Sequence, residues 1–431
     1  MPELLIVGGD LVDESGRRRG DVLVRDGAIA AVGEGIGDGA AAGPNVTVLD
    51  AGGCIVAPGL VDLHAHLRQP GREEAETIET GARAAALGGY TAIVAMPNTE
   101  PAIDSPGIVR EVRDLAAGVA CEVLVAAAIT VGRRGEQLSP MAELAALGVR
   151  LFTDDGNGVQ DARLMRRALE YASGLDITLA QHCEDEILAA GGHMHEGEWS
   201  SRLGIPGIPS EAEEVMVMRD IALSRLTGGR VHFLHLSTAR SVALVAAAKA
   251  EGLRITAEAA PHHFTLTDAE VAAFDPVFKV NPPLRSRADV DAVRAGLAAG
   301  TIDAIATDHA PHAPEVKEAP FDQAPPGMLG LETALALALT ELDLPIEQVL
   351  GLLSWRPAVI AGCRADHGGP ILEGGPANLC VIDPEAAWVV EPGQLASRSR
   401  NTPYAGRKLK GRVRHTILAG TPTVRDGEAQ Q

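Results

Sequence analysis

Two histidines separated by one residue, His64 and His66, follow a short apolar stretch of this chain. Residues i and i+2 of a β-strand point to the same face, so both imidazoles are expected to converge on one point. Two neutral imidazoles at the end of a buried strand are a common way to hold a zinc-like ion. A pair of hydrogen-bonded, partly buried histidines is the alternative, and the His-x-His spacing alone does not decide between the two.

Further histidines and aspartates follow other apolar runs and supply more donors of the same kind. The candidate metal ligands are His64, His66, Asp155, His182, His235 and Asp308. One tetrahedral ion with an open position needs fewer donors, whereas two ions that share a carboxylate and a hydroxide would use all six. Asp154 competes with Asp155 for the shared position, because strand alternation lets only one of them face inward. Asp308 is also the candidate proton acceptor beside the metals.

The remaining histidines give weaker signals. His193 and His195 repeat the spacing within a Gly-rich segment that no apolar run precedes, so we expect them at the surface. His262 and His263 are consecutive, and at most one of them is expected to line a pocket. His232 lies at the wrong end of its apolar run.

The elements that must position these residues form a repeating pattern. Eight short apolar runs alternate with helical patterns, at residues 60–63, 91–95, 123–128, 149–152, 177–180, 231–234, 254–258 and 304–306. This alternation predicts an α/β fold with a (β/α)8 TIM-like barrel over residues 57–360. An open doubly wound sheet is the alternative, but no Gly-rich phosphate loop follows the first run. The candidate ligands follow the ends of the runs, where barrels build their active sites.

The two ends of the chain differ from the middle. Residues 1–56 and 361–431 contain short apolar runs bounded by Gly, Pro and Asp, which are typical of β-hairpins. Sheets of that size are rarely stable alone, which favours their pairing. We therefore predict one small β-sandwich domain built from both termini.

Composition restricts the partners and the compartment. The 431 residues include 58 acidic and 37 basic side chains, a net charge of −21, and no basic patch interleaved with aromatics, so we expect no nucleic-acid partner. The five cysteines are scattered without CxxC spacing, which favours reduced thiols. Neither a signal peptide nor an apolar run of about 20 residues is visible. We expect a cytoplasmic protein without membrane association.

Three polar side chains are candidates for substrate recognition. Arg68 lies two residues beyond His66, where a guanidinium could hold a substrate carboxylate. Asn98 and Asn281 lie in Pro-flanked loops, which hold amide groups with little loss of entropy. Residues 310–330 are rich in Pro, Ala and Gly and could form a mobile lid or a simple insertion.

Eight sequence blocks, in order and across nearly the whole chain, resemble those of the class I dihydroorotases of the amidohydrolase superfamily. The first is VDLHAHLRQPG at residues 61–71, and the others lie at residues 77–81, 96–99, 152–156, 181–184, 235–238, 258–263 and 306–312. The resemblance implies zinc-dependent interconversion of N-carbamoyl-L-aspartate and L-dihydroorotate in de novo pyrimidine biosynthesis. In the hydrolytic direction, a hydroxide that bridges the metals would attack the ring amide, with Asp308 as the catalytic proton carrier.

The same resemblance implies roles for individual residues. Two zinc ions per subunit would be held by the six candidate ligands, with Asp155 rather than Asp154 as the bridging carboxylate. The residues implied to contact the substrate are His66, Leu67, Arg68, Asn98, Asn281, His312, Pro326 and Gly327. The chain departs from the usual family pattern at Gln69, Asn378 and His195, none of which is a candidate ligand.

Related families and a non-catalytic role are the alternatives. Allantoinases and dihydropyrimidinases resemble this chain but bridge their metals through a carboxylated lysine after the fourth strand, and residues 151–157 contain no lysine. Homologues that serve as inactive partner subunits of aspartate carbamoyltransferase have lost metal ligands, whereas all six positions are filled here. We expect a homodimer, and association with aspartate carbamoyltransferase stays open.

Overall fold

Eight parallel strands form a closed barrel in the middle of the chain. The computed structural model describes residues 3–36 and 46–430. The barrel strands are β6 (Leu60–Ala65), β7 (Tyr90–Ala95), β8 (Glu122–Val125), β9 (Leu151–Thr153), β10 (Thr178–Gln181), β13 (Val231–Phe233), β14 (Ile255–Ala259) and β15 (Ala304–Ile305). They pair in chain order as β6-β7-β8 and β9-β10-β13-β14-β15. Parallel bridges from Ala127 to Phe152 and from Ala65 to His309 close the ring, so the predicted barrel is confirmed.

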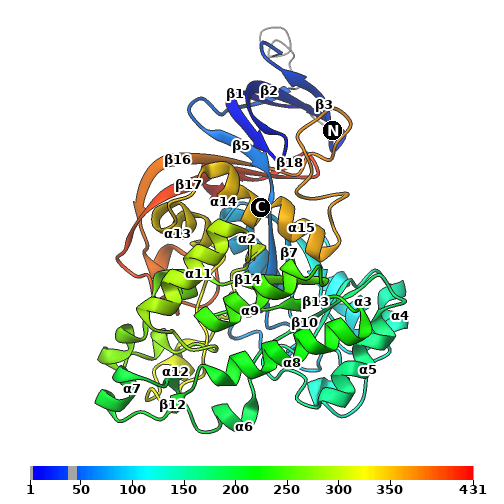
Figure 1. Ribbon diagram of the computed structural model, residues 1–431. Coiled ribbons are helices and arrows are strands. Elements are labelled where there is room, and N and C mark those ends of the chain that lie inside the picture. The colour runs from blue at the N-terminus through cyan, green and yellow to red at the C-terminus, as the bar shows by residue number, and fades with distance from the viewer. Residues whose placement is uncertain (1–2, 37–45, 431) are drawn as a thin grey trace.

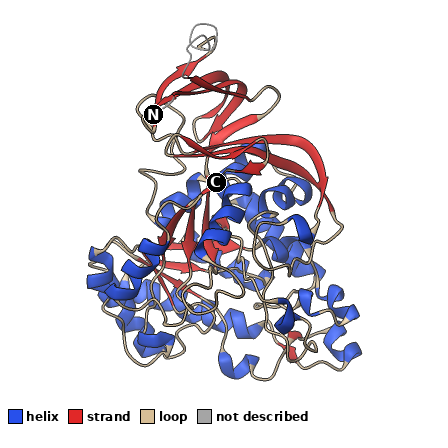
Figure 2. Cartoon of the chain, turned by 180° about the vertical axis from the view of Figure 1, so that it is seen from behind, coloured by secondary structure: helices blue, strands red, loops and turns tan. Residues whose placement is uncertain are grey.

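Helices surround the barrel, as Figure 2 shows. All residues of β6 and β7 are buried, which is typical of strands covered on both faces. Helix α5 buries Met165, Ala168, Leu169 and Ala172, the spacing of one helical face. The helices are α2 (Ile78–Leu87), α3 (Pro106–Leu115), α4 (Met141–Ala146), α5 (Ala162–Ala172), α6 (Glu186–Ala189), α7 (Glu198–Leu203), α8 (Glu211–Thr227), α9 (Ala239–Ala250), α10 (Pro261–Thr265), α11 (Arg287–Ala299), α12 (Pro314–Lys317), α13 (Ala334–Glu341), α14 (Ile346–Leu353) and α15 (Trp355–Ala361), with short 3-10 turns η1 (Val131–Arg133), η2 (Asp268–Ala273), η3 (Pro276–Phe278) and η4 (Pro392–Gln394).

Both ends of the chain share one sheet, which lies at the top of Figure 1. Its strand order is β19-β18-β17-β16-β5-β1-β2-β3, with β4 beside β1. The apolar core beneath it takes Leu4, Ile6 and Leu11 from one end and Leu379 and Ile417 from the other. The predicted β-domain built from both termini is therefore confirmed, and where a β-sandwich was predicted its strands belong to one nine-stranded sheet. Its strands are β1 (Glu3–Asp13), β2 (Gly16–Arg25), β3 (Ala28–Gly33), β4 (Val46–Asp50), β5 (Ile55–Pro58), β16 (Leu379–Val389), β17 (Lys408–Leu418), β18 (Thr421–Arg425) and β19 (Glu428–Ala429).

The long β16–β17 hairpin attaches this domain to the barrel. Helix α13 packs against β17, and the Thr416 hydroxyl donates to the Ala86 carbonyl of α2 at 2.7 Å. Between the two strands, residues 390–407 return to the barrel, where the Ser399 hydroxyl donates to the Ala75 carbonyl. None of the helices in the described ranges has the length and hydropathy needed to cross a membrane.

Candidate metal centre and substrate pocket

The six predicted metal ligands converge at one end of the barrel. Each of them lies at or just after the C-terminal end of a barrel strand, and all are buried: His64, His66, Asp155, His182, His235 and Asp308. Parallel strands bring these ends to one face, so residues up to 244 positions apart in the chain become neighbours. The structure therefore places the whole predicted set in one cluster.

Asp155 lies at the centre of that cluster. Its Oδ1 atom is 3.4 Å from His64 Nε2, 3.5 Å from His182 Nδ1 and 3.6 Å from His235 Nε2. Its other oxygen, Oδ2, is 3.6 Å from His66 Nε2. Asp155 thus belongs to both groups of donors that could hold an ion, one with His64 and His66 and one with His182 and His235.

The neighbouring Asp154 points away from the cluster. Its Oδ1 accepts from the Thr130 backbone N–H at 2.9 Å, and its Oδ2 accepts from the Thr130 hydroxyl. Strand alternation left the choice between Asp154 and Asp155 open, and the geometry places Asp155 among the donors.

Two of the histidines have their ring protons fixed by neighbouring acceptors. His64 Nδ1 donates to Glu258 Oε1 at 2.9 Å, and His66 Nδ1 donates to Asn98 Oδ1 at 2.8 Å. Each imidazole therefore directs the lone pair of its Nε2 atom into the cluster. This arrangement is usual for histidines that bind metal ions.

Three residues of the site have a backbone conformation that side chains rarely adopt. The φ angles are 63° at Arg68, 30° at His235 and 46° at Asp308. Positive φ in a residue other than glycine costs on the order of 1–3 kcal/mol and is concentrated at functional sites. Here it turns the chain just beyond the strand ends, so that these side chains reach the barrel mouth.

The donor set fits divalent metal ions. His64 Nε2 and Asp155 Oδ1 are buried and have no hydrogen-bond partner among the described residues. Such atoms are costly unless a further ligand satisfies them. Burial alone raises the pKa of Asp155, but His64, His182 and His235 lower it well below its usual range, so the carboxylate is ionised. Imidazole nitrogens with ionised carboxylates are the donors that zinc and similar ions prefer.

A cavity of about 230 Å³ opens beside the cluster, and Arg68 lines it. The Arg68 side chain is 7% exposed, and its Nε donates to the Pro311 carbonyl at 3.1 Å. Burial lowers the pKa of Arg68 to about 10, so the guanidinium stays charged at neutral pH. A second cation, Arg72, lines the same cavity and was not anticipated from the sequence.

The other residues predicted to contact the substrate line this cavity, with the exception of Leu67. Asn98, Asn281, His312, Pro326 and Gly327 all line it. Leu67 does not, because its side chain packs in the barrel core against Gly81.

His312 and Gly327 already make close contacts with other residues of the cavity wall. Burial and the nearby Arg68 lower the pKa of His312 to about 3, and its Nε2 donates to the Pro326 carbonyl at 2.8 Å. Gly327 has a φ of 136°, and an added Cβ there would lie 2.9 Å from His312 Nε2. Only glycine therefore leaves room for the hydrogen bond between His312 and the Pro326 carbonyl.

Residues 310–330 are held in place by hydrogen bonds from one of their own side chains and from a loop of the β-domain. The buried Nζ of Lys317 donates to the carbonyls of Pro325 and Gly327, each at 3.0 Å. Asn401, from the loop between β16 and β17, donates to the carbonyls of Ala310 and Gly327 at 3.0 and 3.1 Å. The β-domain therefore contributes a residue that shapes the barrel's cavity, and nothing in the sequence pattern pointed to it.

The histidines set aside from the sequence occupy several environments. Of the consecutive pair, His262 faces the cluster, with Nε2 3.7 Å from Asp308 Oδ2, and His263 Nε2 instead donates to the Pro282 carbonyl. His193 and His195 were predicted to lie at the surface, and the structure agrees only in part. His195 is half-buried in a short strand, β11 (Met194–His195), which pairs with β12 (Gly207–Ile208).

Two buried carboxylates that support the cluster were missed. Glu258 is fully buried in β14 and binds both His64 and His232, the latter at 3.0 Å. Asp62 in β6 accepts from the Thr307 N–H at 2.8 Å and from its hydroxyl at 2.6 Å, which fixes the chain next to Asp308. An acidic residue inside an otherwise apolar strand was the available signal for both.

Comparisons with known proteins agree with the geometry. A family model described as "Dihydro-orotase-like" matches residues 53–241. The dihydroorotase of Pelotomaculum thermopropionicum is 48% identical over 98% of this chain and 99% of its own, and that of Mycobacterium tuberculosis is 48% identical over 95% and 96%. The fold is similar to that of an L-hydantoinase (dihydropyrimidinase) from Arthrobacter aurescens, with 24% identity, a TM-score of 0.89, and coverage of 100% of this chain and 98% of that one. This chain belongs to the dihydroorotase family.

Proposed function

We propose that this protein is a zinc-dependent dihydroorotase that interconverts L-dihydroorotate and N-carbamoyl-L-aspartate. The observation that carries the proposal is the pairing of the six-residue donor cluster with the buried Arg68 in one cavity. The cluster suits hydrolysis of an amide, and the guanidinium suits a substrate that carries a carboxylate. Relatives with 48% identity over nearly their full length are named dihydroorotase, which supports the same activity.

His64, His66, Asp155, His182, His235 and Asp308 would hold two ions, with Asp155 shared between them. When bound, such ions supply a water of lowered pKa and polarise the carbonyl under attack. Zinc is proposed because imidazole dominates the donor set.

The chain's own residues then account for binding and proton transfer. Arg68 binds the substrate carboxylate, and Asn98 helps to position it while keeping His66 oriented. Asp308, whose Oδ1 is 3.3 Å from His66 Nε2, accepts the proton of the attacking water and delivers it to the leaving ring nitrogen. Burial raises the pKa of Asp308, but its contact with His66 and the nearby His64 and His235 lower it below its usual range, so it begins the hydrolytic reaction in the basic form that this role requires.

The remaining substrate contacts are proposed from the cavity lining. Asn281 offers its side-chain amide, and the Pro326 carbonyl keeps a second lone pair beyond its bond to His312. A role for Leu67 would have to come from its backbone. Residues 151–157 contain Asp155 but no lysine like the one that bridges the metals of allantoinases and dihydropyrimidinases, which favours dihydroorotate over their substrates.

The test is hydrolysis of L-dihydroorotate, with dihydrouracil and allantoin measured in parallel. The protein is assayed as purified, after chelation and after zinc is returned, with metal content determined on each sample. We expect activity toward dihydroorotate that disappears with the metal and returns with zinc. Full metal occupancy without dihydroorotate turnover would reject the proposal, and turnover of dihydrouracil instead would favour a dihydropyrimidinase-like enzyme.

An Arg68→Met variant makes the test specific. The lost charge-assisted bond should raise KM for dihydroorotate roughly 10- to 100-fold. Any turnover of dihydrouracil, which has no carboxylate, should be unchanged. An equal loss on both substrates would remove Arg68 from carboxylate recognition.

We further propose a cytoplasmic homodimer, with association with aspartate carbamoyltransferase as a separate possibility. Single exposed apolar side chains such as Ile187 on α6, at 82%, and Leu226 on α8, at 62%, are available for such contacts. Light scattering of the purified chain, alone and with the carbamoyltransferase, tests both assemblies.

A further inference from the structure

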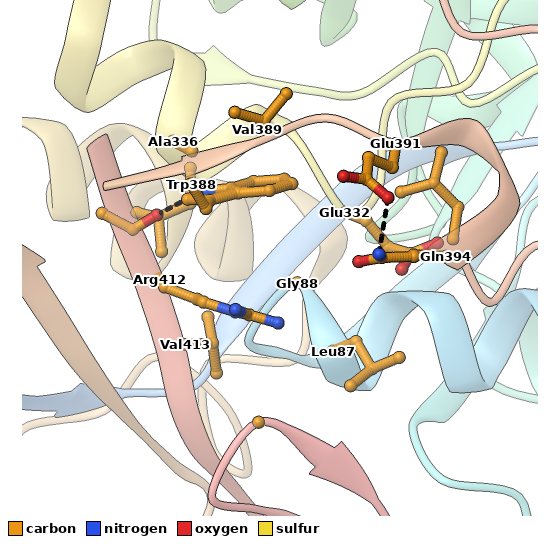
Figure 3. A pocket seen from close by; sticks show the side chains of 14 residues that line it. Leu87, Gly88, Glu332, Ala336, Trp388, Val389, Glu391, Gln394, Arg412 and Val413 are labelled. Atoms are coloured by element: carbon orange, nitrogen blue, oxygen red, sulfur yellow. Dashed lines mark hydrogen bonds between the residues drawn. The ribbon is translucent and has the colours of Figure 1, made fainter. Parts of the chain in front are cut away.

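A second cavity, of about 370 Å³, lies away from the metal cluster (Figure 3). It is bounded by the end of α2, by α13 and by the β16–β17 hairpin, and it shares no lining residue with the active-site cavity. Its volume falls within the range of small-molecule sites, about 300–1,000 Å³. Nothing in the proposed reaction uses it.

One wall of this cavity is a fixed aromatic ring. The Trp388 indole donates from Nε1 to the Gly411 carbonyl at 3.0 Å, which holds the ring in place. Leu87 and Val413 line the cavity below it in the view of Figure 3. An aromatic face opposite aliphatic side chains favours a planar ring as the occupant.

A guanidinium without a partner extends between these walls. Arg412 lines the cavity, and its side chain makes no ion pair or hydrogen bond with any described residue. Its neighbours on the same strand are paired, Lys410 with Glu385 at 2.9 Å and Arg414 with Asp426 at 3.1 Å. Arg412 is therefore available to an anionic group on a ligand.

A carboxyl group lines the same cavity. Glu332 Oε1 accepts from the backbone N–H groups of Ala396 and Ser397, at 2.8 and 3.3 Å, which leaves its second oxygen for a donor. Burial raises the pKa of Glu332 to about 7, which weakens its repulsion of an anion near neutral pH. The other carboxylate, Glu391, accepts from Gln394 at 2.6 Å.

The chain segment that Glu332 holds continues into the active site. Next to the Glu332 contacts, the Ser397 hydroxyl and the Arg398 N–H donate to Glu76, which also contacts His309, the neighbour of Asp308, at 3.2 Å. A few residues further on, Asn401 fastens the cavity segment of the active site. Residues 396–397 are thus joined to Asn401 by a short, hydrogen-bonded length of chain.

We propose that this second cavity is a regulatory site for a small planar compound that carries an anionic group and a hydrogen-bond donor. The ring stacks on Trp388, the anionic group pairs with Arg412, and the donor binds Glu332. The ligand acts on the reaction through residues 390–404, because these residues line the cavity at one end and hold the active-site segment at the other.

Calorimetric titration of the metal-loaded enzyme with 4-aminobenzoate tests the binding. This probe has the planar ring, the carboxylate and the hydrogen-bond donor, and a Kd of about 1 mM is expected for its size. The neutral 4-aminobenzamide should bind at least 10-fold more weakly. Arg412→Met should reduce 4-aminobenzoate affinity at least 10-fold, whereas Arg414→Met, which removes a paired arginine of the same strand, should not.

Binding is measured independently of catalysis, so its outcome does not depend on the proposed reaction. Absence of saturable binding, or equal binding by the Arg412→Met and unaltered proteins, would overturn the site. Thermal unfolding of Arg412→Met should match that of the unaltered protein, since the Arg412 side chain is exposed, and the same measurement on Arg414→Met checks that this control is folded.

The link to the active site has its own measurement. Saturating 4-aminobenzoate should change KM or kcat for dihydroorotate at least twofold in the unaltered protein and in Arg414→Met, but not in Arg412→Met. Thermodynamic linkage adds a second test with a nonreactive substrate analogue. The analogue should change the affinity for 4-aminobenzoate, and 4-aminobenzoate should change the affinity for the analogue, by the same factor. Binding without either effect would overturn the regulatory role.

Discussion

Replacement of Glu258 by glutamine tests whether the metal cluster depends on a carboxylate outside the proposed ligand set. Glu258 is fully buried, and its two oxygens accept from His64 Nδ1 at 2.9 Å and from His232 Nε2 at 3.0 Å. Glutamine has the same shape but one acceptor oxygen and one donor nitrogen. With the oxygen kept toward His64, the new amide N–H group faces His232.

The variant should keep its fold because His232 can adapt. Its Nδ1 is 2.8 Å from the Thr256 hydroxyl, which accepts as readily as it donates, so His232 can carry its proton on Nδ1 and accept from the new amide at Nε2. What is lost is the negative charge that makes His64 a stronger donor to a metal. Partners of this kind are worth roughly 10- to 100-fold in metal affinity, and we expect about 10-fold for the charge alone. Glu258→Ala would leave two buried N–H groups unpaired, at about 1–3 kcal/mol each.

Metal affinity is measured by competition with a chromophoric chelator, beside thermal unfolding and dihydroorotate hydrolysis. Glu213→Gln is the control for loss of a buried carboxylate charge, since Glu213 is also buried but contacts Ser237, Thr238 and, at 3.8 Å, Arg285 rather than a ligand histidine. We expect weaker metal binding in Glu258→Gln and normal binding in the control. Metal affinity within twofold of the unaltered protein would refute the role given to Glu258.

Three further predictions follow from the site and its supports. Asp308→Asn should lower kcat by about 10²-fold or more while substrate affinity stays similar, and near-normal turnover with full metal content would remove Asp308 from proton transfer. Asn401→Ala should raise KM for dihydroorotate more than it lowers kcat, because it frees residues 310–330 without touching the metal cluster; an unchanged KM would contradict this. Glu332 has a folded pKa of about 7 and an ordinary pKa of 4.5, so its contribution to stability is present below about pH 4.5 and is lost as the pH rises through about 7. The unfolding temperature of Glu332→Gln, relative to the unaltered protein, should therefore rise between pH 5 and pH 8, and a constant difference would show that the carboxyl titrates normally.

Periodicity and strand-end chemistry were enough to predict the barrel and the convergence of the six candidate metal ligands at one of its ends. Apolar runs at regular intervals gave the eight strands, and the polar residues that follow them had to share one face once the strands were parallel. The choice between Asp154 and Asp155 depended on which residue continues the inward face of β9. A bond from Asp154 to Thr130 settles that choice, and no local pattern encodes it.

The sequence was less informative about the residues that support the ligands. Glu258 and Asp62 are visible in the sequence only as acidic residues in apolar strands, and their partners lie on other strands. Asn401 gave no signal, because its role depends on a loop of one domain reaching the cavity of the other. Contacts of this kind are set by tertiary packing rather than by residue spacing.

The distribution of charge reconciles an acidic protein with an anionic substrate. The net charge of −21 lies mostly on exposed side chains, and at physiological ionic strength such charges are screened beyond about 8 Å. Arg68 and Arg72 line the cavity itself, and Arg133 lies beside Gly156 at its wall. Arg68 is nearly buried, so its attraction for a carboxylate acts through a medium that screens it far less than bulk water does. The local cations therefore determine what the cavity binds, and the total charge does not.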